Sequence, residues 1–82
     1  MIKVNIKFFG PLRDIIRKDE MTMEFPTICT GEAVFEHLVV AHPELRKWRQ
    51  SVRLAVNLEY AQFSNGVHDG DEVCFIPPVS GG

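Results

Sequence analysis

The residues of this chain that could do chemistry stand at its C-terminal end. The sequence closes with Pro77-Pro78-Val79-Ser80-Gly81-Gly82, and we expect a free carboxylate on Gly82. Gly81 and Gly82 have no side chains, so nothing in the dipeptide shields the terminal carbonyl group. A narrow pocket on a partner could admit this segment where it could not admit a branched side chain. We therefore expect residues 77–82 to form a tail that presents its carboxylate to another protein.

A terminal Gly-Gly can also be no more than a frayed end, because chain termini are often poorly ordered. Two terminal glycines arise by chance in about one chain in two hundred. The functional interpretation is favoured here because an apolar strand and two prolines precede the glycines. Pro77 and Pro78 limit the conformations that the tail must lose on binding, which lowers the entropic cost. Fully extended, residues 77–82 reach at most about 20 Å, enough to enter a deep site on another chain.

Other reactive side chains form no recognisable constellation. Cys29 and Cys74 make no C-x-x-C pair, and we expect two small buried hydrophobes in a reducing compartment. His37 and His42 are five residues apart, so they do not share a helix face, and His68 stands alone in a predicted loop. No metal site is predicted. No base accompanies a nucleophile, so we expect the catalytic groups to come from partners and not from this chain.

Length and composition indicate one small domain. The chain has 82 residues, of which 45% are hydrophobic, enough to bury a single core. No apolar run approaches the length of a membrane span. The N-terminus alternates apolar and polar residues where a signal peptide would show a continuous apolar block, so we expect a cytoplasmic protein with no membrane partner. A net charge of −2 gives no support for a nucleic-acid partner.

The charges are unevenly distributed along the chain. All nine Lys and Arg residues fall within residues 1–53, together with seven acids. Beyond Arg53 the charged side chains are all acidic: Glu59, Asp69, Asp71 and Glu72. They could form an ordinary solvated surface. The functional interpretation is that the end bearing the tail is acidic and docks on a basic surface of a partner.

Periodicity predicts the elements that must position the tail. In the first half of the chain, alternation of apolar and polar residues predicts strands over residues 2–8 and 21–25, paired as an antiparallel hairpin. Residues 11–16 between them are expected to form a short helical turn. Helical spacing then predicts the main helix from Thr30, a good N-cap, to about His42.

In the second half of the chain, the sequence predicts a short helix, two strands and a short return strand between them. A short helix is expected over residues 43–48, with Trp48 at the margin of the core. Residues 52–56 alternate as a strand, a tight turn follows, and a short return strand is expected near Tyr60. The last strand, residues 72–76, is apolar on both faces, which is typical of a central strand.

These elements predict an α+β domain. Its mixed sheet has four to five strands, with one main helix packed across it. Residues 1–76 form the domain, and residues 77–82 form the tail. A central last strand placed beside the first would direct the tail away from the end of the sheet.

The order of elements and the Gly-Gly end resemble the ubiquitin-like β-grasp sulfur carriers and, more narrowly, the small subunits of molybdopterin synthase. The resemblance covers the whole chain, and its ending is the specific part. The residues that carry it are Phe8-Phe9-Gly10 with Leu12-Arg13, Thr30-Gly31-Glu32-Ala33-Val34, Ala55-Val56-Asn57, and Asp69-Gly70-Asp71-Glu72-Val73 with Phe75 and the final Pro77-Pro78-Val79-Ser80-Gly81-Gly82.

The resemblance implies a chemistry at Gly82. A partner that resembles ubiquitin-activating enzymes would use ATP to convert the Gly82 carboxylate to an acyl-adenylate, and a sulfur donor protein would then leave a thiocarboxylate. The tail would enter the large subunit of the synthase and sulfurate cyclic pyranopterin monophosphate, in an assembly of two small and two large subunits. The chain itself would bind no cofactor. The implied partner-binding residues are Phe75, Pro77, Pro78, Val79, Ser80 and Gly81, although Phe75 fits a core position equally well.

Three other functions share parts of this pattern. One is a sulfur carrier for another pathway, such as thiazole synthesis, although those carriers usually lack the Phe-x-Pro-Pro-Val run. Another is a protein modifier whose Gly82 forms an isopeptide bond with lysines of target proteins. The third is an interaction domain with an inert tail. The sequence leaves the sulfur donor open, as well as the number of pathways that one carrier serves.

Overall fold

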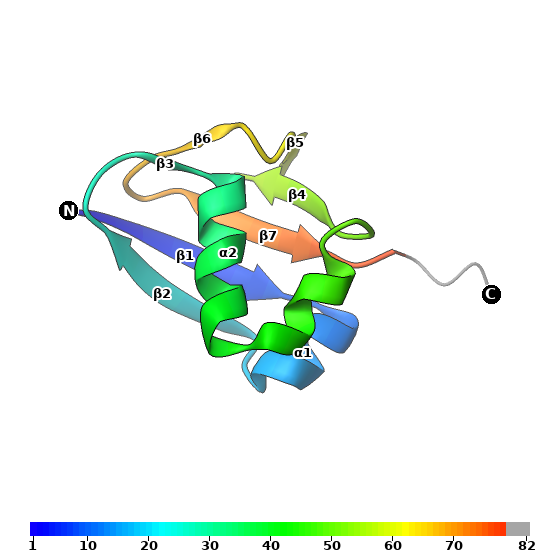
Figure 1. Cartoon of the computed structure of the whole chain (residues 1–82). Coiled ribbons are helices and arrows are strands. Elements are labelled where there is room, and N and C mark those ends of the chain that lie inside the picture. Colours follow the sequence, from blue (N-terminus) through cyan, green and yellow to red (C-terminus); the bar gives the residue numbers. More distant parts are fainter. Residues whose placement is uncertain (79–82) are drawn as a thin grey trace.

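One layer of the structure is a five-stranded sheet, and the helices form a second layer across one of its faces (Figure 1). The computed structural model describes residues 1–78, so Val79, Ser80, Gly81 and Gly82 lie outside the described residues. The elements, in chain order, are β1 (Ile2–Phe8), α1 (Gly10–Ile16), β2 (Glu20–Phe25), β3 (Cys29–Thr30), α2 (Gly31–Ala41), the 3₁₀ helix η1 (Pro43–Trp48), β4 (Arg53–Val56), β5 (Glu59–Ala61), β6 (Gly66–Val67) and β7 (Glu72–Ile76).

The sheet has the order β2-β1-β7-β4-β5, which places the last strand in the centre. β7 runs parallel to β1, with Phe8 opposite Phe75, and antiparallel to β4, with Arg53 opposite Ile76. β1 and β2 form the expected antiparallel hairpin. The predicted mixed sheet and the central position of the last strand beside the first are therefore confirmed.

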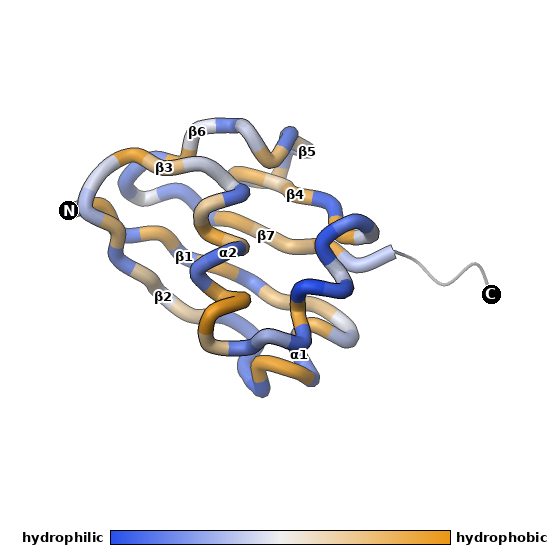
Figure 2. The backbone as a smooth tube through the Cα atoms, in the orientation of Figure 1, coloured by the Kyte–Doolittle hydropathy of each residue, from blue (hydrophilic) through white to orange (hydrophobic). Residues whose placement is uncertain are grey.

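The core lies between the sheet and α2. Alternate residues of β1 are buried, and Val4 and Ile6 are fully shielded from solvent. Val34, Phe35 and Leu38 supply the facing stripe of α2 at helical spacing. Figure 2 shows the hydrophobic residues of β1 and β7 running beneath this helix. Burial of such apolar side chains is the main stabilising term for a domain of this size.

The main helix begins where the sequence predicts. The Thr30 hydroxyl accepts a hydrogen bond from the Ala33 backbone N–H at 3.1 Å and caps α2. Gly31, the first helical residue, lies against the buried side chain of Leu54, where a Cβ would overlap the leucine methyl groups. The absence of a side chain at Gly31 thus lets the helix start approach β4 closely.

Some elements differ from the sequence prediction. α1 begins at Gly10, one residue earlier than expected, and η1 is a 3₁₀ helix. β3 and β6 pair with each other as a separate two-stranded sheet that the sequence did not reveal, because two residues are too few to display a period. Trp48 is half-buried against the core, as predicted. Among residues 1–78 no helix is long and apolar enough to cross a membrane.

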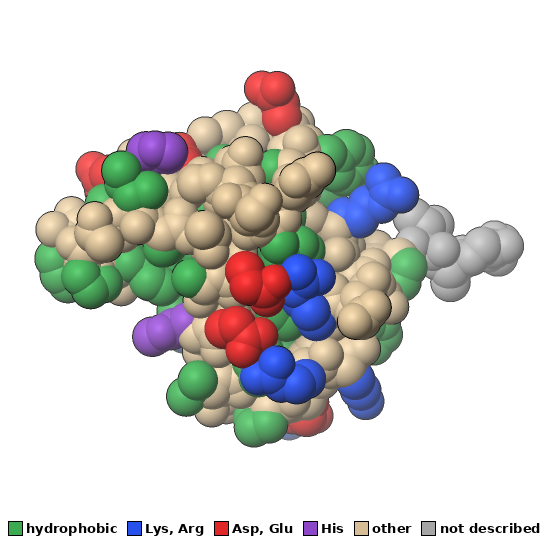
Figure 3. Space-filling view, turned by 45° about the horizontal axis from the view of Figure 1, so that its top comes forward, with side chains coloured by type: hydrophobic (Ala, Val, Ile, Leu, Met, Phe, Trp, Pro, Cys, Tyr) green, Lys and Arg blue, Asp and Glu red, His purple; other side chains and the backbone are tan. Residues whose placement is uncertain are grey.

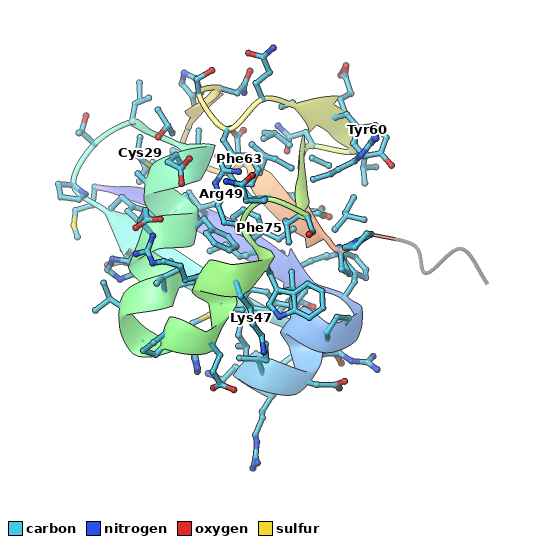
Figure 4. The ribbon with its side chains drawn as sticks, turned by 45° about the vertical axis from the view of Figure 1, so that its right-hand side comes forward. Cys29, Lys47, Arg49, Tyr60, Phe63 and Phe75 are labelled. Atoms are coloured by element: carbon cyan, nitrogen blue, oxygen red, sulfur yellow. The ribbon has the colours of Figure 1, made fainter. Side chains whose placement is uncertain are left out.

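An ion pair and an aromatic cluster join η1 to the start of α2. The Arg49 guanidinium donates to both carboxylate oxygens of Glu32, with Nε at 3.1 and 3.0 Å, and lies 3.5 Å from the centroid of the Phe63 ring. Phe63 in turn contacts Phe35 and Phe75, whose rings pack edge to face with centroids 5.3 Å apart. Figure 4 shows Arg49, Phe63 and Phe75 together between the helices and the sheet. The pair thus covers the edge of the aromatic core.

This ion pair predicts an acid-sensitive component of stability. The hydrogen bond from Arg49 holds the pKa of Glu32 below its usual value. A lowered folded-state pKa stabilises the protein above the unfolded-state pKa of about 4.3, and this stabilisation is lost as the pH falls through the folded-state pKa. Because both side chains are partly solvated, we expect Glu32→Gln to cost about 0.5–1 kcal/mol at pH 7 and to cost progressively less below pH ~4. Urea denaturation at pH 7 and at acidic pH measures this difference.

The matched control is Glu36→Gln. Glu36 lies one turn further along α2 and pairs with Arg46, whose side chain is 64% exposed against 31% for Arg49. Solvent screening should make its loss at pH 7 smaller than that of Glu32→Gln. A gap between wild type and Glu32→Gln that stays constant down to acidic pH would contradict the assigned role of the ion pair.

Candidate functional site

The root of the tail is fixed at the end of β7. Ile76 is paired with Arg53 of β4, and Pro77 and Pro78 follow directly. Pro77 is half-buried and lies against Gly10, where an added Cβ would be 3.3 Å from the Pro77 Cγ atom. Gly10 has a φ of 55°, a conformation that glycine adopts readily. The start of α1 and the central strand therefore hold the point from which residues 79–82 continue.

An apolar hollow of about 250 Å³ lies beside this root on the face of the sheet opposite α2. Side chains alternate across β7, so Val73 and Phe75 point to the core, and Cys74 and Ile76 point to the opposite face. The residues that line the hollow, which we call the back-face patch, are Phe9, Ala55, Leu58, Tyr60, Cys74 and Ile76. Phe9, Leu58 and Tyr60 are 45%, 83% and 69% exposed. The patch is thus an apolar surface continuous with the root of the tail.

A groove connects the back-face patch to the tail. It has a volume of about 550 Å³, and its lining includes Arg53, Tyr60, Ile76, Pro77 and Pro78. The Arg53 guanidinium lies 5.6 Å from the centroid of the Tyr60 ring, and both residues line this groove beside the root of the tail. Figure 4 shows Tyr60 at the outer edge of the sheet. The groove thus places the positive charge of Arg53 next to the apolar back-face patch.

The prediction that the tail-bearing end is acidic is wrong for the part of the chain that the structure describes. Glu72 begins β7, and Asp69 and Asp71 precede it, whereas the tail leaves from the other end of that strand. Glu59 is opposite Val56 and so also lies at the far end of the sheet. Arg53 is the charged residue opposite Ile76. Figure 3 shows Lys and Arg side chains toward the side where the described chain ends. Neighbours in sequence are separated here because an extended strand rises about 3.3 Å per residue.

The alternative that Phe75 is an exposed partner contact is also wrong. Phe75 is fully shielded from solvent, with its ring against Phe35 and Phe63. The sequence could not decide this point, because β7 is apolar on both faces and its period of two does not say which face meets the helix. Pro77 and Pro78 directly follow β7, and their role in partner binding stays a prediction. The predicted roles of Val79, Ser80, Gly81 and Gly82 fall outside the described residues.

The sequence profile of the ThiS family matches residues 6–82. The chain belongs to the ThiS family. It is 41% identical to a molybdopterin synthase sulfur carrier subunit of Mycobacterium tuberculosis over 85 residues that cover 100% of both chains. This full-length similarity confirms the resemblance predicted from the ending and the element order.

Solved structures support the ubiquitin-like β-grasp fold of this ThiS family member. SAMP1 from Haloferax volcanii, a small archaeal modifier protein, superposes with a TM-score of 0.83 at 26% identity and covers 98% of this chain and 99% of its own. A chain from the complex of subunits 1 and 2 of the molybdopterin-converting factor of Helicobacter pylori gives a TM-score of 0.66 at 22% identity, over 99% of this chain and 100% of that chain. The predicted fold class is confirmed.

Sequence reasoning on this ThiS family chain missed the back-face patch. Phe9 follows β1, Ala55 belongs to β4, and Leu58 and Tyr60 come from the β4–β5 turn and β5. These segments meet only through the strand order, and so no local spacing reveals them. The two aromatic residues Phe9 and Tyr60 were the available signal in the sequence. The structure shows that both are exposed, and large exposed apolar side chains next to one another mark interaction sites.

The two cysteines are free thiols, with Cys74 buried and Cys29 half-buried. Burial raises the pKa of both thiols, and the neighbouring Glu72 carboxylate raises that of Cys74 further. Both therefore stay protonated at neutral pH and are poor nucleophiles. Cys74 behaves as the small hydrophobe that the sequence predicted, here in the floor of the back-face patch.

Proposed function

We propose that this chain is the sulfur carrier subunit of a molybdopterin synthase, working in the cytoplasm with its reactive group at Gly82. The observation that carries the proposal is the full-length similarity to a sulfur carrier subunit, together with a central strand that ends in Pro77-Pro78. A carboxylate is a poor electrophile, so it needs activation. An adenylating partner supplies this: the Gly82 carboxylate attacks the α-phosphate of ATP, and pyrophosphate leaves.

The acyl-adenylate is then converted to a thiocarboxylate. A sulfur donor protein attacks the Gly82 carbonyl carbon, the C–O bond to AMP breaks, and AMP leaves. With a persulfide as the attacking group, a thiol then cleaves the S–S bond to the donor and forms a disulfide with it, and the released sulfur stays on Gly82 as the thiocarboxylate. In the large subunit this sulfur forms a C–S bond to cyclic pyranopterin monophosphate. Water then cleaves the bond between the sulfur and the Gly82 carbonyl carbon, which returns the tail to a carboxylate. The chain supplies the carrier group, and its partners supply ATP and the catalytic residues.

The back-face patch and the groove at Arg53 fit the docking surface for the large subunit. The tail reaches at most about 20 Å. When it enters a partner's site, the surface around its root must therefore lie against that partner. Around this root lie the apolar patch and the Arg53 cation held on Tyr60. Apolar and aromatic side chains at the centre of an interface, with charge at its rim, are typical of protein–protein recognition. The large subunit is thus the proposed occupant of this face.

A protein modifier is the second candidate, because the SAMP1 structure shares the fold over nearly the whole chain at 26% identity. Both candidates pass through the acyl-adenylate at Gly82. They differ in the group that attacks it, sulfur in one and the amine of a lysine in the other. The product on Gly82 therefore separates the two functions.

The test is the mass of the C-terminal peptide of protein made in its native cell. Replacement of one oxygen by sulfur is close in mass to oxidation of one of the three methionines. Fragment ions must therefore place the change on Gly82. We expect a thiocarboxylate there. A Gly82–lysine linkage would instead support the modifier, and a carboxylate unchanged after incubation with ATP, activating enzyme and sulfur donor would exclude both functions.

A further inference from the structure

The two-residue turn between β4 and β5 holds a leucine in a conformation that leucine disfavours. Val56 is opposite Glu59, and the residues between them, Asn57 and Leu58, have φ values of 52° and 70°. Hairpin turns with two positive φ values strongly prefer glycine at the second position, as in Asn-Gly. A branched side chain there is strained. Turn chemistry therefore explains Asn57 but not Leu58.

Hydrogen bonds hold this turn against the start of β7. The Asn57 side-chain amide donates to the Asp71 carboxylate at 2.9 Å, and its oxygen accepts from the Glu72 backbone N–H at 2.9 Å. Burial acts to raise the pKa of Asp71, but hydrogen bonds from the His68 backbone and Asn57 outweigh it and keep the pKa low, so the carboxylate stays charged at neutral pH. Leu58 is thus fixed in place by its neighbours.

Packing within the chain does not explain Leu58 either. Its side chain is 83% exposed, so it gains little burial on folding. It does line the back-face patch with Phe9, Tyr60 and Ile76, and this patch is continuous with the root of the tail. A strained backbone that presents an exposed apolar side chain at an interaction surface is the pattern expected of a functional position.

We propose that Leu58 is a contact residue that inserts into an apolar pocket of the large subunit, kept at the expense of the stability of the free chain. This inference rests on the proposed function, which brings the large subunit against the back-face patch. It predicts two opposite effects of one side chain: Leu58 lowers the stability of the free protein and raises the affinity for the large subunit. No purely structural role of a turn residue predicts both effects.

The experiment uses the full chain with Leu58→Gly and Leu58→Asn. Glycine and asparagine tolerate the left-handed conformation, so the free variants should melt about 3–5 °C higher than wild type. Titration against the large subunit by calorimetry should show a Kd at least about tenfold weaker, since a buried leucine contact is lost. The matched control is Val40→Ala on α2, because Val40 is also 83% exposed but lies on a helix outside the patch. It should leave the Kd unchanged.

The outcomes separate this inference from the proposed function. If wild type binds the large subunit and both Leu58 variants bind equally well, the inference is overturned while the proposed function stands. Variants that melt lower than wild type would overturn the claim of strain. If wild type itself fails to bind the large subunit, the proposed function fails and the inference fails with it.

Discussion

Deletion of Gly82 is expected to reduce thiocarboxylate formation by at least about a thousandfold. The variant still ends in a carboxylate, on Gly81, but its carbonyl carbon is withdrawn by one residue, about 3.3–3.6 Å along an extended tail. A misplacement of about 1 Å can already cost about a hundredfold in an enzymatic reaction. The root of the tail, held by Gly10 and β4, cannot move forward to compensate. The loss thus comes from position and not from chemistry.

The measurement is the rate of thiocarboxylate formation in a single turnover with activating enzyme, ATP and sulfur donor. Mass spectrometry detects the product. Val40→Ala is the matched control, because Val40 is 83% exposed on α2 and its substitution leaves the tail and its length unchanged. This variant should react within a few-fold of wild type. Thermal unfolding of the deletion variant should match wild type. A deletion variant that gains sulfur on Gly81 at the wild-type rate would show that the activating enzyme does not measure the position of the terminus.

The fold could be predicted from the sequence where a long pattern determines one element. β1 alternates over seven residues, α2 has a cap and a continuous stripe, and β7 is apolar throughout, so their pairing follows from general rules of α+β domains. Two-residue strands such as β3 and β6 have no pattern to detect. Their pairing is a consequence of the neighbouring helix and turn, which no local rule describes.

The candidate site could be predicted only in the part that is continuous in sequence. The tail is one stretch, and the strand, the two prolines and the Gly-Gly end together predict a carboxylate that is presented to a partner. The back-face patch is assembled from separate segments around Phe9, Ala55, Tyr60 and Ile76, and it exists because the sheet order brings them together. The charge prediction failed for a related reason, since residues adjacent to the tail in sequence lie at the opposite end of β7.

Phe75→Ala is expected to destabilise the chain by about 3–5 kcal/mol, as truncation of a buried aromatic residue typically does. Phe75 has no solvent exposure, and its loss removes the contacts with Phe35 and Phe63 under the Arg49 ion pair. Small domains have total stabilities of about 5–15 kcal/mol, so this loss removes a large fraction of the stability and should clearly lower the midpoint of urea denaturation. Phe75→Leu keeps most of the volume and should cost clearly less. Urea denaturation followed by tryptophan fluorescence measures both, with Trp48 as the reporter.

Ile76→Ala is the informative partner of this variant, because Ile76 is the next residue and points to the opposite face of the sheet. It is half-buried in the back-face patch, so we expect a stability loss of about 1 kcal/mol or less and a Kd for the large subunit about tenfold weaker. The two variants are thus expected to have opposite profiles. Phe75→Ala mainly lowers the stability of the chain, and Ile76→Ala mainly lowers its affinity for the large subunit. If Phe75→Ala stayed fully folded but lost binding, or if Ile76→Ala bound normally, the assignment of the two faces of β7 to core and partner would be wrong. The two variants have the same chain length and the same tail, and the two substitutions are adjacent in one strand. A difference between their effects on stability and on affinity therefore reports the face of the sheet on which each side chain lies.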